Sequence, residues 1–344
     1  MRVTPKRKSV LYVIASVMMA SLLIFTAGCG NTSQGKIVEG KVNVVTSFYP
    51  LYYMASEIGG DEVNVMNLIP TGVEPHDWTP KSLDLQNASK AQVLIYQGSG
   101  FEGWIDDFKK GLDSNSQVKL VEASTGISLI ASEESEADHD HDHDGDAHDD
   151  EAAEDHDHAA EKAHDHAHDH GGVDPHTWVS PKSALIMAKN VKQALVDADP
   201  AHESLYEERY QALHEKLEAL DQQYTDQLAD LSHREIVVSH QAFGYLARDY
   251  QLAQHSIMGL SPEAEPTAQE LVRLSKLVKE QGLKYIFFEE LVTDQLASTL
   301  ANEADVETLV LNPLEGLTEQ QEQAGDNYIS LMERNLENLV KALK

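Results

Sequence analysis

Length, composition and charge limit the classes of protein to which this chain can belong. The chain has 344 residues, of which 41% are apolar, and its formal net charge is −32. This length is enough for two domains, each with its own buried core. The negative charge excludes a nucleic-acid surface, because phosphate binding requires clusters of Lys and Arg and none appears beyond the first eight residues. Cations are the partners that such a charge favours.

The N-terminus has the pattern of a secretory signal. Basic residues precede an apolar run from Val10 to Phe25, and small residues then lead to Cys29, the only cysteine in the chain. This segment resembles the lipobox of bacterial lipoproteins, with Thr26 where Leu is usual. We therefore expect a signal peptide over residues 1–28, lipidation of Cys29 and a tether over residues 29–40. A cleaved signal without a lipid, or an uncleaved anchor, is the alternative.

Short apolar runs alternate with segments of helical spacing after the tether. The helical segments lie near Leu51–Ile58, Ser82–Ser89 and Phe101–Gly111. The runs between them are rich in β-branched residues and predict four strands, at Val42–Val45, Val63–Leu68, Val93–Tyr96 and Val118–Val121. Strands separated by helices form a parallel sheet that is covered on both faces. The pattern predicts an N-terminal α/β lobe over residues 41–180.

The same alternation returns in the last third of the chain. It predicts a C-terminal α/β lobe over residues 233–344, with a closing helix from about Thr318 to Leu343 and four strands, at Ile236–Ser239, Leu252–Ile257, Tyr285–Phe288 and Thr308–Leu311. Residues 181–232 carry helical periodicity that is broken only at Asp199–Pro200, and they predict a helical connector. The fold class is therefore α/β, with two lobes of parallel sheet and a helical segment between them.

One segment stands outside this alternation. Residues 138–170 contain ten His and fourteen Asp or Glu, with a single Lys and almost nothing that could enter a core. We expect a disordered loop over residues 131–172. A solvated acidic linker would not need histidine, so we interpret the loop as a collector of metal ions with many exchangeable sites.

The principal site is sought among histidines near predicted strand ends. His76 follows the second predicted strand, and His240 follows Ile236–Ser239 in the other lobe. His176 lies in an Asp-Pro-His-Thr-Trp segment just before the connector, and Glu289 directly follows Tyr285–Phe288. Ligands of α/β sheets bind beyond the carboxyl ends of the strands. Two residues from each lobe therefore predict one metal site in a shared cleft.

These segments resemble those of a known family. The sequence has a Gly-Val-Glu-Pro-His-Asp-Trp motif at His76, an Asp-Pro-His-x-Trp motif at His176 and a Ser-His-x-Ala-Phe-Gly-Tyr motif at His240. The chain is similar to the metal-binding lipoproteins of bacterial ABC importers, the cluster A-I solute-binding proteins, in their zinc-selective ZnuA/AdcA-like branch. The resemblance implies two small α/β lobes joined by a long backbone helix, with the metal between them.

The resemblance also implies ligands. The first three family ligands correspond to His76, His176 and His240, and Glu289 fits the variable fourth position best, with Glu290 or water as alternatives. Three imidazoles and one carboxylate suit four-coordinate Zn²⁺, whereas Mn²⁺ favours more oxygen ligands, and manganese-selective relatives have a carboxylate in place of the third histidine. Asp77 and Asp174 are candidates to orient the imidazoles.

The function that follows is capture of Zn²⁺ outside the cytoplasm and its delivery to the membrane permease of an ABC transporter. We expect a lipid-anchored monomer that is not an enzyme and takes Zn²⁺ as its transported ligand. A manganese-binding importer protein, a zinc-dependent hydrolase and a surface adhesin are the alternatives. The hydrolase is disfavoured because the sequence has neither a His-Glu-x-x-His segment nor a Gly-x-Ser-x-Gly segment.

Overall fold

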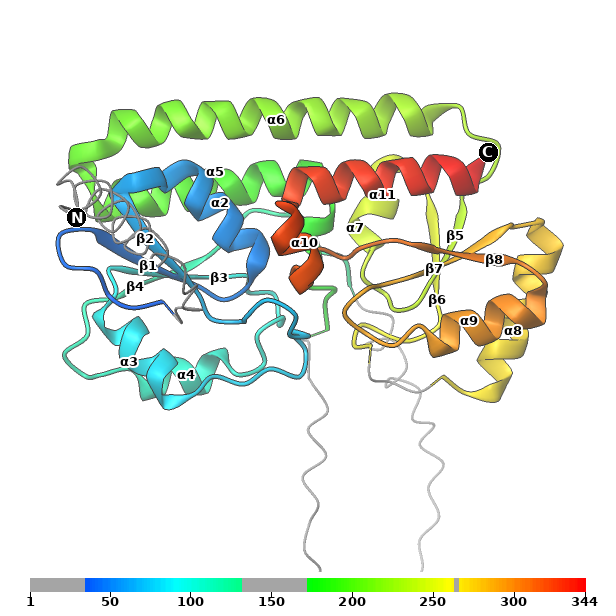
Figure 1. The fold of residues 1–344 in the computed structure, drawn as a ribbon, viewed down its shortest axis with the longest axis horizontal. Helices are drawn as coiled ribbons and strands as arrows, with labels where there is room; N and C mark the ends of the chain where they lie inside the picture. Colours follow the sequence, from blue (N-terminus) through cyan, green and yellow to red (C-terminus); the bar gives the residue numbers. More distant parts are fainter. Residues whose placement is uncertain (1–34, 132–171, 263–265) are drawn as a thin grey trace, which may run out of the picture. The chain divides into compact units, whose positions relative to one another are not determined.

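The computed structural model describes residues 35–131, 172–262 and 266–344 (Figure 1). The expected signal peptide, the lipidation site Cys29 and the His-rich segment 138–170 lie outside the described residues. Residues 37–344 form one compact unit. Within the described residues, no helix is both long and apolar enough to cross a membrane.

A four-stranded parallel sheet forms the centre of the N-terminal lobe. Its strand order is β2-β1-β3-β4, with bounds β1 (Val42–Thr46), β2 (Val63–Asn67), β3 (Val93–Tyr96) and β4 (Lys119–Glu122). Neighbouring residues of β1 face opposite sides, so Val44 packs in one apolar cluster and Val45 in another. Helices α2 (Tyr49–Gly59) and α5 (Pro181–Ala198) cover the first side, and α3 (Ser82–Lys90) and α4 (Ile105–Gly111) cover the second. Both faces are therefore buried, as the apolar runs predict.

The C-terminal lobe contains two parallel strand pairs. The pairs are β5 (Glu235–Val238) with β6 (Ala253–Ser256) and β7 (Tyr285–Phe288) with β8 (Glu307–Val310), and β5 packs beside β7. Helices α8 (Ala268–Gln281) and α9 (Gln295–Ala304) pack on one side against Val237 and Ile286. Helices α7 (Gly244–Tyr250) and α11 (Tyr328–Leu343) pack on the other. All eight predicted strands are present within one residue of their expected bounds.

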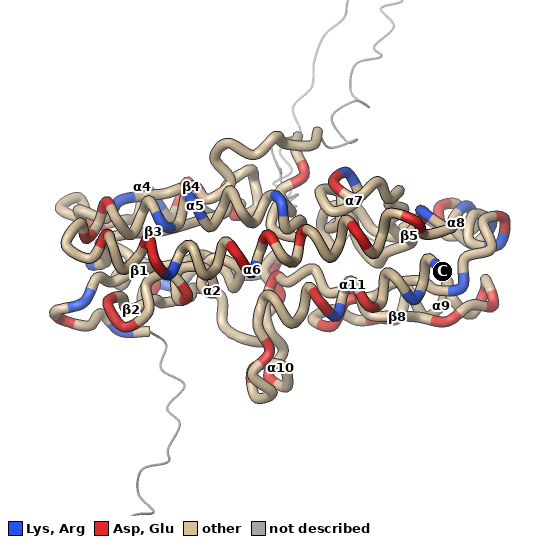
Figure 2. Tube along the Cα trace, turned by 90° about the horizontal axis from the view of Figure 1, so that it is seen from above, with Lys and Arg blue, Asp and Glu red and all other residues tan. Residues whose placement is uncertain are grey.

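A single long helix runs along both lobes. Helix α6 (Glu203–Ala229) has 27 residues, so it is about 40 Å long at 1.5 Å per residue. Figure 2 shows it passing α5 and α2 at one end and α11 at the other. Arg209 donates to the Gly59 carbonyl in the N-terminal lobe, and Tyr224 donates to the Met332 carbonyl on α11. Helix α6 is therefore the long backbone helix that the family resemblance implies.

The structure confirms the predicted helix break at Asp199–Pro200 and corrects two other predicted helices. The segment 181–232 contains two helices, because α5 ends before Asp199–Pro200 and a 3-10 turn, Pro200–His202, leads into α6. Helix α5 packs on the N-terminal sheet. The predicted closing helix is split into α10 (Glu319–Ala324) and α11, because Gly325 adopts φ 77° and the Asn327 side chain caps α11. The helix expected from Phe101 starts only at Ile105.

Candidate metal centre

Three histidines and one glutamate meet in the interior between the two lobes. One ligand atom from each of His76, His176, His240 and Glu315 lies within 4.8 Å of the other three. The Oε1 atom of Glu315 is 3.5 Å from the Nε2 atoms of His76 and His176 and 3.6 Å from that of His240. All four side chains are at most 5% exposed. The structure thus brings together the three predicted histidines.

His76 reaches this position on the segment that follows β2. The segment turns at Gly72, where φ is 78°, and the Gly72 amide donates to the Leu317 carbonyl of the other lobe. The Glu74 carboxylate accepts from the Asp77 amide at 3.1 Å and closes a tight turn around His76. Asp77 is exposed and supplies the amide of this turn, and its expected role in orienting the ring stays a prediction.

His176 is held by Asp174. The Asp174 Oδ1 atom lies 2.8 Å from Nδ1 of His176 and also accepts from the His176 amide at 2.9 Å. Tyr245 donates its hydroxyl proton to the Asp174 carbonyl at 2.6 Å. Gly244 leaves room for the carboxylate, since a Cβ atom there would lie 2.5 Å from Asp174 Oδ2. Asp174 therefore has the orienting position that its sequence proximity predicts.

His240 has a second buried carboxylate behind it. Glu289 Oε1 lies 2.6 Å from Nδ1 of His240 and accepts from the Ser239 hydroxyl at 2.6 Å. In this arrangement Nε2 of His240 faces the other three side chains of the group. Glu289 thus corresponds to Asp174 in its relation to a site histidine.

Glu315 enters the site from the loop after β8. Asn312 lies at the start of this loop, and its Oδ1 atom accepts a hydrogen bond from the Leu314 amide. Leu314 itself adopts φ 61°. The Pro313 carbonyl accepts from Nε1 of Trp178 at 2.7 Å, which fixes the loop to the segment that carries His176. A non-glycine residue in the left-handed region is unusual and here turns the chain so that Glu315 faces the imidazoles.

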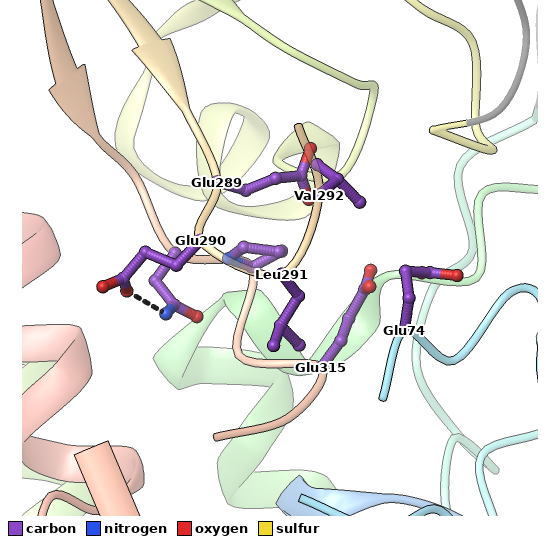
Figure 3. A pocket seen from close by; sticks show the side chains of 8 residues that line it. Glu74, Glu289, Glu290, Leu291, Val292 and Glu315 are labelled. Carbon is purple, nitrogen blue, oxygen red and sulfur yellow. Dashed lines mark hydrogen bonds between the residues drawn. The ribbon is translucent and has the colours of Figure 1, made fainter. Parts of the chain in front are cut away.

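The fourth position in the structure is therefore not the one expected from the sequence. Glu289 was expected as a ligand, but Glu315 completes the group of four, and Glu289 binds the far side of the His240 ring. The alternative Glu290 accepts instead from Asn312 and Gln321. Glu289, Glu290, Glu315 and Glu74 line one small cavity, and Figure 3 shows Glu74 next to Glu315, on the side away from Glu290.

Charge in the group is distributed unevenly. Burial lowers the pKa of His240, but the Glu289 and Glu315 carboxylates together outweigh burial and raise that pKa well above its usual value. Burial also lowers the pKa of His176, but the carboxylates of Asp174 and Glu315 raise it, and the net effect is an increase. At His76 burial is the stronger effect, and the pKa is lowered. Burial raises the pKa of Glu315, but the imidazoles overcome it and hold the pKa well below the usual range. The carboxylate is thus ionised and suited to a cation.

The donor set fits a divalent cation of borderline softness. In the part of the chain that the structure describes, the Nε2 atoms of His176 and His240 and the Oε1 atom of Glu315 are buried and make no hydrogen bond. Buried polar atoms ordinarily have partners, and atoms that converge without one indicate a place for an ion. Three imidazole nitrogens and one carboxylate oxygen are a common tetrahedral set for Zn²⁺.

The fold and this site define a class, a two-lobed α/β protein of the solute-binding type with a buried centre between its lobes. Residues 44–342 match the family model described as zinc-uptake complex component A, periplasmic (ZnuA). The chain belongs to this family.

Relatives agree with this assignment. The chain is 38% identical over 323 residues to the zinc-binding protein AdcA of Streptococcus pyogenes, covering 94% of this chain and 60% of AdcA. It is 37% identical to the high-affinity zinc uptake system protein ZnuA of Bacillus subtilis, covering 95% and 96%. The crystal structure of the Zn(II)-bound ZnuA-like domain of Streptococcus pneumoniae AdcA matches with a TM-score of 0.70 and 35% identity, over 88% of this chain and 99% of that one. The chain thus spans about 60% of the length of AdcA.

Proposed function

We propose that the chain binds one Zn²⁺ through His76, His176, His240 and Glu315 and delivers it to the permease of an ABC importer. The observation that carries this proposal is the convergence of four buried ligand atoms within 4.8 Å of one another. Each of two imidazoles has a carboxylate on its Nδ1 side, which leaves Nε2 for a metal and increases its basicity. Relatives named for zinc binding and zinc uptake support the choice of ion.

The proposal includes the location of the protein. Lipidation of Cys29 after removal of residues 1–28 would hold the chain, as a monomer, at the extracytoplasmic face of the cell membrane. A relative from Streptococcus pneumoniae, 38% identical, is named zinc-binding lipoprotein AdcA, which supports this part. In this proposal the N-terminal lobe comprises residues 41–180, and α6 is the connection to the C-terminal lobe.

The proposal treats the protein as a carrier and not as an enzyme. A catalytic zinc keeps one position open for water or substrate. Here four protein ligand atoms converge in a group whose members are at most 5% exposed, which would fill a tetrahedral shell. Manganese remains the alternative ion, but it favours oxygen ligands and higher coordination numbers than three imidazoles and one carboxylate provide.

A competitive titration tests the function and the ligand set together. The chain from Gly30 onward is titrated with Zn²⁺, and in parallel with Mn²⁺, against a chelator strong enough to strip the weak sites of residues 138–170. We expect one tight zinc equivalent that Mn²⁺ does not match. Alanine at His76, His176, His240 or Glu315 should remove it, while alanine at the surface residue His214 serves as the control. Retention of tight zinc by all four variants would refute the proposal.

A further inference from the structure

The segment that follows β3 has an unusual backbone. Gly98, Ser99 and Gly100 all adopt positive φ, at 80°, 53° and 81°. Ser99 is not a glycine, so this conformation is held against its own preference by the surroundings. The next residue, Phe101, is directed into the site region, and its amide donates to the Gly98 carbonyl at 3.1 Å.

Glu102 fixes the start of this segment. Its Oε1 atom accepts from the Gln97 amide at 2.7 Å, and its Oε2 atom accepts from the Gly98 amide at 2.9 Å. The side chain is only 3% exposed. A buried carboxylate that holds two adjacent amides closes residues 97–102 into a compact loop.

Gln97 connects this loop to the segment of His176. Its Nε2 atom donates to the Pro175 carbonyl at 3.1 Å and to the Thr177 hydroxyl at 2.7 Å. These two groups belong to the residues on either side of His176. The side-chain amide of Gln97 therefore fixes the backbone around His176, whereas Asp174 fixes the imidazole ring of the same residue.

Phe101 contacts the two site histidines of the N-terminal lobe. Its ring centroid lies 5.5 Å from that of His76, at 79°, and 6.4 Å from that of His176, at 71°. Phe48 and Trp178 also pack against the Phe101 ring, with distances between ring centroids of 4.8 and 4.7 Å. An apolar wall on this side supplies no oxygen ligand and restricts how far either imidazole can turn.

We propose that residues 97–102 are a positioning segment, in which Glu102 fixes the backbone so that Gln97 and Phe101 hold His76 and His176 in the four-coordinate arrangement before the metal arrives. This inference rests on the proposed zinc site. Residues that support a metal site through its ligands typically contribute roughly 10–100-fold to affinity. Because Phe101 adds no oxygen donor, its loss should also weaken discrimination against ions of higher coordination number.

The test uses the full chain, with the substitutions Phe101→Leu, Gln97→Leu and Glu102→Gln. The matched controls are Phe108→Leu, a buried aromatic of the same lobe that packs in a different cluster, and Glu57→Gln, a carboxylate of the same lobe that accepts from Lys216 on α6. Zinc affinity comes from chelator competition, and the unfolding temperature of the metal-free protein is recorded for each variant. Co²⁺ then reports the geometry, because four-coordinate Co²⁺ absorbs visible light far more strongly than six-coordinate Co²⁺. The spectrum of His76→Ala, which lacks the site, is subtracted.

The three segment variants should bind zinc roughly 10–100-fold more weakly, release it faster and show weaker cobalt absorption. The controls should change the unfolding temperature at most. Unchanged affinity and spectra in Phe101→Leu and Gln97→Leu, or equal changes in Phe108→Leu, would overturn the inference even if Glu102→Gln fails to fold. Absence of tight zinc in the unsubstituted chain would instead refute the proposed function.

Discussion

The Oε1 atom of Glu289 lies 2.6 Å from Nδ1 of His240, on the opposite side of the ring from the atom that faces Glu315. Asp174 has the same relation to His176, at 2.8 Å. Each lobe therefore contributes one imidazole with a buried carboxylate behind it. A carboxylate in this position fixes the tautomer and the direction of the ring, which a metal centre requires of its ligands.

The different positions of Glu289 and Glu315 predict different effects of substitution. Glu289→Gln should weaken zinc binding by roughly 10–100-fold, because the amide can still contact His240 but no longer raises its basicity. Glu315→Gln should reduce affinity further, because it removes the only carboxylate in the group of four. Competition titration measures both, with Glu290→Gln as the control. A larger loss in Glu289→Gln than in Glu315→Gln would show that Glu289 is the ligand, and equal losses would contradict the separate roles.

Substitution of Gly244 should act on the site through Asp174. A Cβ atom at this position would lie 2.5 Å from Asp174 Oδ2, so Gly244→Ala should displace the carboxylate that orients His176. Overpacking of this kind costs about 1–3 kcal/mol of stability. The matched control is Gly59→Ala, where the added atom would meet the side chain of Val63, which is not a member of the site. Both variants should lower the unfolding temperature, but a zinc affinity equally reduced in both would contradict a specific role for Asp174.

Zinc affinity should rise with pH. Burial lowers the pKa of His240, but the Glu289 and Glu315 carboxylates together outweigh burial and raise the pKa well above the usual value of about 6.5. The metal-free site consequently keeps a proton at neutral pH, and zinc must displace that proton to bind Nε2. Each displaced proton gives about a tenfold gain in affinity per pH unit below the folded pKa. Calorimetry in buffers of different ionisation enthalpy counts the protons released, and a count of zero at pH 7 would contradict this expectation.

Removal of residues 138–170 should leave the tight site intact. The four candidate ligands lie outside that segment. The chain on its two sides is also connected, because the Asp174 amide donates to the Ile130 carbonyl. This hydrogen bond holds the two ends of the removed segment close together, so a short connection can join them in the shortened chain. We expect the same zinc affinity in competition with a chelator, with fewer weakly bound ions by equilibrium dialysis. Loss of the tight equivalent, as in His76→Ala, would show that the His-rich segment is the true site.

Local sequence patterns determined the lobes and the three histidines. Strands such as Val93–Tyr96 were predictable because a strand buried on both faces must be a continuous apolar run, and that requirement is visible in a few consecutive residues. His76 and His240 were predictable because parallel strands end at a common edge of a sheet. The helix end at Gly325 also has a local signal, since glycine is common in the left-handed position that follows a helix.

The fourth member of the site was decided by tertiary structure alone. Both Glu289 and Glu315 follow a strand of the C-terminal lobe, Glu289 at once and Glu315 after a short loop, so the strand-end rule admits both. Which carboxylate reaches the imidazoles depends on the left-handed turn at Leu314 and on the bond from Trp178 to Pro313, a contact across 135 residues. Sequence determines which residues lie near the edge of a sheet. The direction of a side chain within the site depends on backbone dihedrals and distant packing, which no local pattern encodes.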